Sequence, residues 1–355
     1  MERKFDSILT QFGFNKEDFD YSPIGNGLIN HTFCLTNRLS AQQFILQEIN
    51  STVFKNPEKI AKNIRLTSDY LKIHYPNYLF LEPLKSIEKQ DLVVREGSFW
   101  RLLPFIKNAI AYDVVDTPEK AYEAAKTFGG LTRRLEGCDL TLFECVLDNF
   151  HDLTFRTDQF TQALKNGDPD RLSTAESLIQ QLKKYNFIEE IYSEWINSEK
   201  YKLRIQHHDT KLSNVLLHEE TYKGLCVIDL DTLMPGYIFS DFGDMMRTYL
   251  SPVSEEETDL EKIIVRSDYF NMITKGYLEE VGAILTTEEK KALFNAGLIM
   301  MYMQSLRFLT DYLNGDVYYK IHSPKHNYER ALNQFTLLER YNDQKNNFER
   351  TINSF

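Results

Sequence analysis

The stretch HHDTKLSNVLLHEETYKGLCVIDLD, residues 207–231, arranges three polar side chains around a short apolar segment. Asp209 stands five positions before Asn214, and Asp229 closes the apolar run CVID that follows. The residues between Asn214 and Asp229 read as two short strands joined by a polar turn, so a hairpin can bring these two side chains together. An amide oxygen beside a carboxylate forms a pair of hard oxygen ligands suited to Mg²⁺. Asp209, left in the loop, can then accept a proton from an attacking hydroxyl group.

These are the parts that phosphoryl transfer requires, because metal ligands neutralise phosphate charge and a base orients the nucleophile. For an isolated aspartate and asparagine at this spacing, turn formation is the more ordinary explanation. His207, however, stands two positions before Asp209 and completes the pattern HxDxxxxN, after which an apolar strand ends in IDLD. The combined pattern favours catalysis over a simple turn. Asp231, the last residue of the stretch, is either a second metal ligand or a residue that ends the strand.

The pattern resembles the kinase-like fold family that contains aminoglycoside phosphotransferases, choline kinases and the catalytic cores of protein kinases. This resemblance implies an α+β, two-lobed protein kinase-like fold, in which a small β-rich N-lobe with one main helix precedes a larger, mostly helical C-lobe. It also implies ATP and Mg²⁺ as cofactors. Lys211 stands two positions after Asp209, where protein kinases carry a lysine that touches the transferred phosphate.

A second motif of the family, DFG, occurs at residues 241–243, too far downstream for its usual role. The metal-binding aspartate of that motif should follow the hairpin directly, and Asp229 occupies that position. We therefore expect Asp241 to brace the loop through hydrogen bonds to its backbone. His207 is expected to support the same loop as a structural histidine.

A change of hydrophobic pattern near residue 106 indicates the two lobes. Up to this point short β-rich stretches predict strands, and one helix interrupts them, with Asn56 as its N-cap and Pro57 at its first position. We predict a nucleotide-binding lobe over residues 1–106 and a helical lobe with the catalytic loop and substrate site over residues 107–355. The predicted strands include HTFCLT, FILQEI, LEPLKS, DLVV and SFWRLLPFI, and the predicted helices are one capped by Thr117, opened by Pro118 and closed by Gly137, and others near 158–166, 171–197, 255–282, 287–313 and 327–350.

The stretch IGNGLINHTF predicts a tight loop at the start of the β-rich lobe, where the kinase phosphate loop belongs. Gly25 and Gly27 allow backbone amides to approach phosphate, and Asn26 tolerates unusual φ angles. The third strand departs from the family pattern, because FILQEI carries Gln47 where this fold usually has a lysine that pairs with the α and β phosphates. The familiar lysine–glutamate pair is therefore in doubt.

The composition favours a small-molecule partner. With 41 basic and 52 acidic residues the formal net charge is −11, so the surface field opposes nucleic acid and anionic lipid. The N-terminus lacks the pattern of a secretory signal, and the uncharged run 292–306 is too short to span a bilayer and reads as a buried core helix. We expect a cytoplasmic protein without nucleic acid, membrane or an obligate protein partner.

Longer stretches resemble the bacterial N-acetylhexosamine 1-kinases over residues 20–335. They are GNGLINHTF, FILQEINSTVFKNPEKIAKNI, FHDLTFR, HHDTKLSNVLL, VIDLDTLMPG with SDFGDMMRT, and RFLTDYLNGDVYYK. This resemblance implies transfer of the γ-phosphate of ATP to the anomeric hydroxyl group of N-acetylglucosamine or N-acetylgalactosamine.

Sugar recognition uses planar polar side chains around hydroxyl groups and an apolar or aromatic floor. The candidates for the small-molecule sugar substrate are His151, Asp152, Arg156, Arg307 and Asp311. Arg307 and Asp311 are four positions apart, so on a helix they share a face and can simply pair with each other.

Two alternatives to the sugar 1-kinase remain open. One is a kinase of the same fold that acts on another small alcohol, such as a different sugar, an amino alcohol or an aminoglycoside. The other is a nucleotide-binding pseudokinase with a regulatory or scaffold role, which Gln47 motivates. Intact Asp209, Asn214 and Asp229 argue against the pseudokinase.

Overall fold

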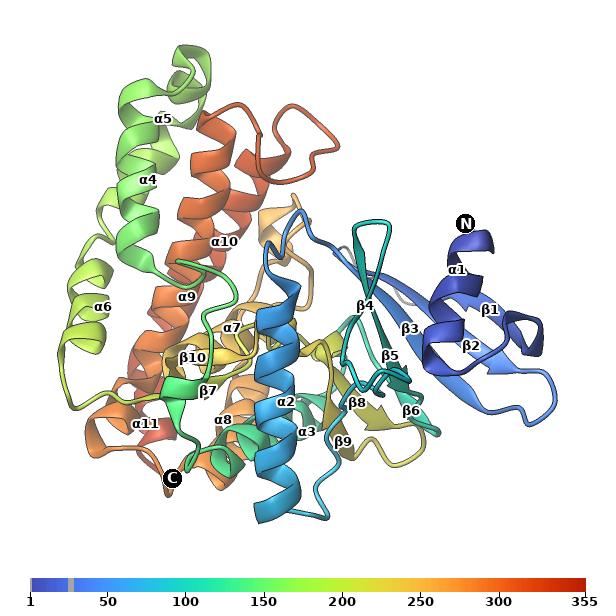
Figure 1. Cartoon of the computed structure of the whole chain (residues 1–355). Helices are drawn as coiled ribbons and strands as arrows, with labels where there is room; N and C mark the ends of the chain where they lie inside the picture. Colours follow the sequence, from blue (N-terminus) through green and yellow to red (C-terminus); the bar gives the residue numbers. More distant parts are fainter. Residues whose placement is uncertain (1, 25–28) are drawn as a thin grey trace. The chain divides into compact units, whose positions relative to one another are not determined.

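The computed structural model describes residues 2–24 and 29–355 (Figure 1). The chain divides into two compact units, and we describe each by itself. The first comprises Met1–Ala109, Gly137–Asp148 and Cys226–Met234, and the second comprises Ile110–Glu136, Asn149–Leu225 and Pro235–Phe355. The predicted lobe boundary at residue 106 stays a prediction.

The first unit is built on an antiparallel sheet of five strands in the order β1-β2-β3-β5-β4. Strand β3 alternates at Phe44 and Leu46 between buried and partly buried side chains, whereas β5 buries three consecutive residues, Trp100, Arg101 and Leu102. The strands are β1 (Phe19–Pro23), β2 (His31–Asn37), β3 (Gln43–Ile49), β4 (Val93–Arg95) and β5 (Ser98–Pro104), and two helices, α1 (Glu2–Leu9) and α2 (Pro57–His74), accompany them.

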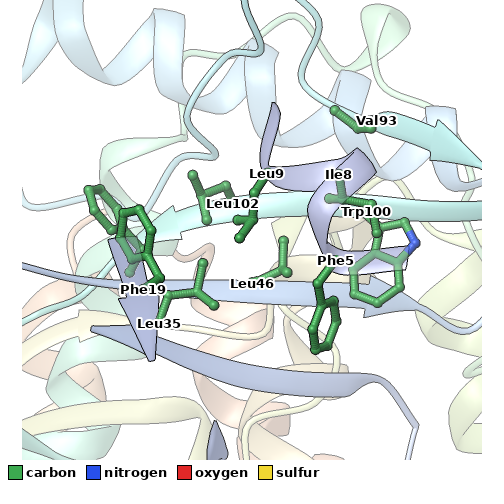
Figure 2. Close-up of a cluster of buried hydrophobic side chains, with 10 residues drawn as sticks. Phe5, Ile8, Leu9, Phe19, Leu35, Leu46, Val93, Trp100 and Leu102 are labelled. Carbon is green, nitrogen blue, oxygen red and sulfur yellow. The ribbon is translucent and has the colours of Figure 1, made fainter. Parts of the chain in front are cut away.

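The core of the first unit lies between α1 and this sheet. Figure 2 shows Phe5, Ile8 and Leu9 on α1 beside Trp100 and Leu102 on β5. Phe5 packs edge to face against Trp100 with ring centroids 5.8 Å apart. The motif reading did not predict α1, because a helix of eight residues depends on such tertiary packing more than on its own propensity.

Helix α2 begins at Pro57 as predicted, but Asn56 makes no side-chain cap hydrogen bond. The predicted strand LEPLKS is also wrong. Among the described residues, this segment contributes only an isolated bridge between Leu84 and Leu102. Pro83 has no N–H group to donate, which shortens the pairing.

The second unit is mainly helical, as predicted. The core helix 287–313 is confirmed, and its N-terminus carries a capping box in which the side chain of Thr286 accepts from the backbone of Glu289. The predicted helix capped by Thr117 is also present, with Pro118 in its first turn. The helices of this unit are α3 (Pro118–Arg134), α4 (Leu153–Asn166), α5 (Pro169–Lys183), α6 (Phe187–Asn197), α7 (Ile238–Tyr249), α8 (Ser267–Val281), α9 (Thr287–Leu313), α10 (His326–Asp343) and α11 (Lys345–Ile352).

Several predicted helices have different limits. The helix expected near 158–166 begins earlier, at Leu153, and the helix expected to close at Gly137 ends at Arg134. The region 171–197 forms two helices, α5 and α6, and the region 327–350 is divided between α10 and α11. The region 255–282 is helical over Ser267–Val281, apart from a short 3₁₀ turn at Leu260–Lys262.

The middle of the chain contains short strands that pair into two small sheets. β7 (Leu203–Gln206) pairs with β10 (Met234–Tyr237), and β8 (Val215–His218) lies between β6 (Ala109–Ile110) and β9 (Gly224–Val227). The predicted hairpin after Asn214 is therefore β8 and β9. Over the described part of the chain, we find no helix that is both long and apolar enough to cross a membrane.

Candidate active site

The loop between β7 and β8, residues 207–214, carries the predicted catalytic residues, and we call it the catalytic loop. Asp241, in the first turn of α7, accepts hydrogen bonds from the backbone N–H groups of His207 (3.0 Å) and His208 (2.7 Å). This helix thus holds the start of the loop. The predicted bracing role of Asp241 is confirmed.

A second carboxylate of α7 holds the next part of the loop. Asp244 accepts a hydrogen bond from the backbone N–H group of Thr210 (2.8 Å) and pairs with Arg247 (2.8 Å). The hydroxyl group of Tyr249 donates to the carbonyl oxygen of Thr210 (2.6 Å). Because both backbone polar groups of Thr210 are bound, the loop enters the catalytic position with a defined conformation.

The two histidines shape the turn before Asp209. His207 Nδ1 accepts a hydrogen bond from the backbone N–H group of Asp209 (3.3 Å), and its ring packs edge to face on Phe128. His208 has a backbone φ of 67°, in the left-handed region that non-glycine residues rarely adopt. A Cβ atom at Gly236 would lie 2.3 Å from the ring of His208, so glycine is required there. His207 is therefore the structural support that its position predicted.

Asp209 receives two side-chain donors on one carboxylate oxygen. Lys211 Nζ lies 2.9 Å from Asp209 Oδ2, and Asn214 Nδ2 donates to the same oxygen at 2.9 Å and to the Asp209 carbonyl oxygen at 2.8 Å. Within the described residues, both side-chain donors thus bind Oδ2. The other oxygen, Oδ1, receives neither of these donors.

The electrostatic surroundings keep Asp209 ionised. Burial by itself raises the pKa of this carboxyl group, but the charge of Lys211 and the hydrogen bonds from Lys211 and Asn214 outweigh it. The pKa of Asp209 therefore lies below its ordinary value. A carboxylate in this state is charged throughout the neutral range, as a base that accepts a hydroxyl proton must be.

The Asn214 amide is oriented by its partners. Both of these partners are hydrogen-bond acceptors on Asp209, so the amide nitrogen must face them. The amide oxygen is then directed to the other side. An oxygen donor in this orientation is compatible with a magnesium ligand, and that role of Asn214 stays a prediction.

Asp229, the second predicted magnesium ligand, belongs to the first unit and directly follows β9 and Ile228. Its backbone is left-handed, with φ 56° and ψ 57°, and it precedes the 3₁₀ turn Leu230–Thr232. Such a conformation is held by its surroundings and is common at functional sites. Because Asn214 lies in the second unit, the pairing of Asn214 with Asp229 stays a prediction.

Asp231, expected from the sequence to be either a second metal ligand or a strand-end residue, is buried against two side chains of the first unit. Its carboxylate is 2% exposed, with Oδ1 paired to Arg101 Nη1 (2.5 Å) and Oδ2 accepting from Asn30 Nδ2 (2.7 Å). Oδ2 is therefore hydrogen-bonded, whereas Oδ1 is in an ion pair but has no hydrogen-bond partner among the described residues. Asp231 lies in the 3₁₀ turn Leu230–Thr232 and not at the end of a strand, and its role as a second metal ligand stays a prediction. The predicted phosphate-loop residues Gly25, Asn26 and Gly27 lie outside the described residues.

Two predicted substrate residues have structural roles instead. Asp152 is the N-cap of α4 and accepts from the backbone N–H group of Phe155 (3.0 Å). Asp311 is buried and accepts from the backbone N–H groups of residues 317, 318 and 319 (2.9–3.0 Å) and from Asn327. These carboxylates organise backbone, so we correct their assignment to the substrate. The helical spacing of Arg307 and Asp311 allowed an ion pair between them, but none is formed among the described residues. Arg307 donates to Gln304 (2.9 Å).

His151 is connected to the catalytic loop through Ser240. The Ser240 hydroxyl group is hydrogen-bonded to the Nδ1 atoms of both His151 and His208, the latter at 2.7 Å. Burial, together with the neighbouring His208 and the positive charge of Arg307, holds the pKa of His151 well below its ordinary value, so this ring is neutral. The ring of Phe150 stacks on His151 with centroids 4.3 Å apart. A continuous series of contacts therefore runs from the catalytic loop to Phe150.

Arg307 lies at the far end of this series, near two aromatic rings. Its guanidinium carbon is 5.7 Å from the ring centroid of Phe150 and 5.8 Å from that of Tyr319. The buried Tyr319 hydroxyl group and Arg156 Nε have no hydrogen-bond partner among the residues that the structure describes. Burial and repulsion by Arg307 lower the pKa of Arg156 to about 10. We call Phe150, His151, Arg156, Arg307 and Tyr319 the arginine–aromatic cluster.

This cluster can provide both parts of a site for a polar small molecule. The rings offer an apolar floor, and the guanidinium and hydroxyl groups offer donors for ligand oxygens. The sequence named His151, Arg156 and Arg307 as substrate candidates, which stay predictions, and did not single out Phe150 and Tyr319. Their ring types are common in cores, and only their position beside Arg307 distinguishes them.

Replacing Lys211 tests its predicted role beside Asp209. Lys211→Ala removes the largest attraction that stabilises the Asp209 carboxylate, so the pKa of Asp209 should rise. We expect kcat at neutral pH to fall by roughly 10²-fold, because a donor near developing charge is lost. The acidic limb of the kcat profile should also move to higher pH, because the predicted base must be ionised to accept a proton. Lys223→Ala, which removes the ion pair between the exposed Lys223 and the buried Glu123, is the matched control. A Lys211→Ala profile that coincides with wild type would contradict this role.

The fold and the catalytic loop define a kinase-like phosphotransferase. The chain is similar over its whole length to a microcompartment-associated aminopropanol kinase (13% identity, 98% of this chain and 99% of that chain, TM-score 0.64). It is also similar to spectinomycin phosphotransferase in complex with ADP and spectinomycin (14%, 99% and 97%, TM-score 0.60) and to choline kinase from Cryptosporidium parvum Iowa II (14%, 100% and 99%, TM-score 0.57). These likenesses confirm the protein kinase-like fold.

Residues 20–263 match the phosphotransferase enzyme family, APH. The chain belongs to this family and is a small-molecule phosphotransferase.

Proposed function

We propose that the protein is an ATP- and Mg²⁺-dependent kinase that phosphorylates the anomeric hydroxyl group of N-acetylhexosamines. The observation that carries the proposal is the state of Asp209, an ionised carboxylate with one oxygen bound by Lys211 and Asn214. Membership of the phosphotransferase family supports the reaction class. The resemblance of the longer sequence stretches to N-acetylhexosamine 1-kinases supports the substrate.

In the proposed reaction, the anomeric oxygen forms a bond to the γ-phosphorus while the bond from that phosphorus to the oxygen of ADP breaks. Oδ1 of Asp209 receives the hydroxyl proton. Lys211 and Asn214 hold the carboxylate during this transfer, so the base loses little freedom when the acceptor arrives.

ATP supplies the phosphoryl group, and Mg²⁺ neutralises charge on its phosphates. We assign the metal to Asn214 and Asp229, whose amide and carboxylate oxygens are the hard donors that Mg²⁺ prefers. Gly25, Asn26 and Gly27 remain the proposed phosphate-binding residues. These assignments of the metal and phosphate ligands are part of the proposal.

The arginine–aromatic cluster is the proposed site for the acceptor sugar. Arg307 and Tyr319 can donate to the sugar and acetamido oxygens, and the ring of Phe150 can cover an apolar sugar face. An acetamido carbonyl oxygen is a strong neutral hydrogen-bond acceptor, and a guanidinium group can donate hydrogen bonds to it. The contacts through Ser240 and His151 connect this cluster to the loop that carries the base.

A reaction panel tests the substrate. Purified protein is incubated with Mg·ATP and free N-acetylglucosamine, N-acetylgalactosamine, glucose, choline, aminopropanol or spectinomycin, and ADP release is followed. Phosphorus NMR of the product should show a phosphate coupled to the anomeric proton. A 6-phosphate product, or turnover confined to the amino alcohols or spectinomycin, would overturn the sugar 1-kinase proposal while leaving the fold intact. Nucleotide binding without turnover of any acceptor would favour the pseudokinase.

The role of Arg307 predicts a separate kinetic result. Arg307→Ala should raise the KM for the acceptor by roughly 10- to 100-fold and leave Mg·ADP affinity unchanged, because a lost hydrogen bond to a charged donor is worth about 1.5–3 kcal/mol. Arg133→Ala, which removes an ion pair with Glu280 on the second unit, is the control. An unchanged acceptor KM in Arg307→Ala would exclude this residue from the sugar site.

A further inference from the structure

A buried arginine, Arg101, lies in the sheet of the first unit next to Gln47, the position where this fold usually has a lysine. Gln47 on β3 lies opposite Arg101 on β5 in the antiparallel register. Directly opposite residues project from the same face of a sheet, so these two side chains meet. Arg101 is 3% exposed. The third strand therefore carries a neutral amide, and the neighbouring strand carries the charge.

The whole guanidinium group of Arg101 is engaged. Its Nε and Nη2 atoms donate to Gln47 Oε1 at 2.8 and 2.5 Å, and its Nη1 atom pairs with Asp231 Oδ1. Gln47 Nε2 donates in turn to Thr32 Oγ1 on β2 (3.1 Å). Gln47 on β3 thus holds the planar guanidinium group, and Thr32 on β2 holds Gln47 in turn. The guanidinium group is directed at the carboxylate of Asp231.

The opposite side of Asp231 is held as well. Asn30 Nδ2 donates to Asp231 Oδ2 at 2.7 Å, and Asn30 Oδ1 accepts from the backbone N–H group of Asn50 (2.9 Å). Asp231 therefore has one bound orientation, fixed by residues before β2, after β3 and on β5. Its side chain ties the segment 229–231 to the sheet.

We propose that Arg101 is a positioning residue, which acts through Asp231 to hold Asp229 in place for the metal. The inference rests on the proposed function, in which Asp229 is a magnesium ligand. Asp229 stands two residues before Asp231 and has a left-handed backbone, which persists only where neighbouring contacts determine it. The ion pair supplies such a contact. In many metal sites, side chains that hydrogen-bond to a metal ligand change the metal affinity without contacting the metal, and the Arg101–Asp231 pair has the same role here.

The same geometry accounts for Gln47. Arg101 directs two donors at this side chain, so the position needs an acceptor, and the amide oxygen provides one. A lysine here would be a second cation opposite Arg101 and would compete for Asp231. The departure from the family pattern at Gln47 is therefore coupled to Arg101 and Asp231.

The test measures Mg·ADP binding by isothermal titration calorimetry, with the melting temperature of each variant recorded alongside. Asp231→Asn keeps the shape of the side chain but removes the ion pair, and Arg101→Lys keeps the charge but not the fork. We expect both to weaken Mg·ADP binding by roughly 10- to 100-fold, the range found for second-layer supports of metal ligands. Arg65→Lys is the matched control, since Arg65 pairs with Glu82 and Asp91 on the same unit. It should lower the melting temperature without changing Mg·ADP affinity.

The affinity for nucleotide without metal separates positioning from general damage. ADP titrated in EDTA should bind the Asp231→Asn and wild-type proteins alike, because the effect acts through the metal ligand. Equal weakening with and without Mg²⁺, or Mg·ADP affinity at the wild-type level in both variants, would overturn the inference. If wild type binds Mg·ADP no better than ADP alone, the metal assignment of the proposed function fails, and this inference fails with it.

Discussion

Asp209→Asn is expected to lower kcat by roughly 10²- to 10⁴-fold, the range typical for loss of a general base. The carboxylate is ionised because Lys211 and Asn214 bind its Oδ2 oxygen and outweigh the effect of burial. Asparagine keeps the size of the side chain but has no oxygen basic enough to accept the hydroxyl proton. The loss should therefore appear in kcat, and Mg·ADP affinity should stay near the wild-type value.

A matched aspartate elsewhere in the second unit controls for this change. Asp168 is the N-cap of α5 and accepts from the backbone N–H groups of Asp170 and Arg171 (3.0 Å each). Asparagine is an equally good N-cap, so Asp168→Asn should leave kcat unchanged. Steady-state kinetics at saturating Mg·ATP and acceptor decide the matter. An Asp209→Asn enzyme that retains more than a tenth of wild-type turnover would show that another group accepts the proton.

Asp229→Asn is expected to remove most Mg²⁺-dependent nucleotide binding, with Mg·ADP affinity falling by at least about 10²-fold. The variant deletes the negative charge from a proposed ligand of a divalent cation, and Mg²⁺ is bound by few protein carboxylates. Asparagine is also the best replacement for the backbone, because Asn and Asp are the non-glycine residues that most readily adopt a left-handed conformation such as φ 56°. The change therefore tests charge with little added strain.

Calorimetric titration with Mg·ADP and with ADP in EDTA gives the measurement. Asp20→Asn is the control on the same unit, since Asp20 is an exposed carboxylate paired with Arg38. Its Mg·ADP affinity should equal that of wild type. If Asp229→Asn binds Mg·ADP as wild type does, the metal ligand lies elsewhere and Asp229 has only a conformational role.

Much of the fold was predictable because its signals are local. Pro57 and Pro118 mark helix starts through their fixed φ angle, and Thr117 and Thr286 cap helices through hydrogen bonds to nearby N–H groups. Element ends were less predictable. The strand expected at LEPLKS is reduced to an isolated bridge, and α1 forms by packing on a sheet whose strands are distant in sequence.

The catalytic loop was likewise determined within a short stretch of sequence. The spacing of Asp209, Lys211 and Asn214 is enough for the lysine and the amide to reach one carboxylate oxygen, because all three lie on one tight loop. The bracing role of Asp241 also followed from its place relative to the hairpin, and its two backbone hydrogen bonds confirm it.

Only the tertiary structure decided the roles of the other carboxylates. A carboxylate can bind a metal, a sugar, a helix N-terminus or an arginine, and the residue type is the same in each case. Asp231 is paired because Arg101, far earlier in the chain, projects toward it from β5, and Asp311 is occupied because the backbone of residues 317–319 turns back on it. The sequence alone determined the helix starts at Pro57, Pro118 and Thr287 and the catalytic loop, where partners are a few residues apart. The structure decided which carboxylates are engaged by protein groups, because those partners meet only when distant segments pack.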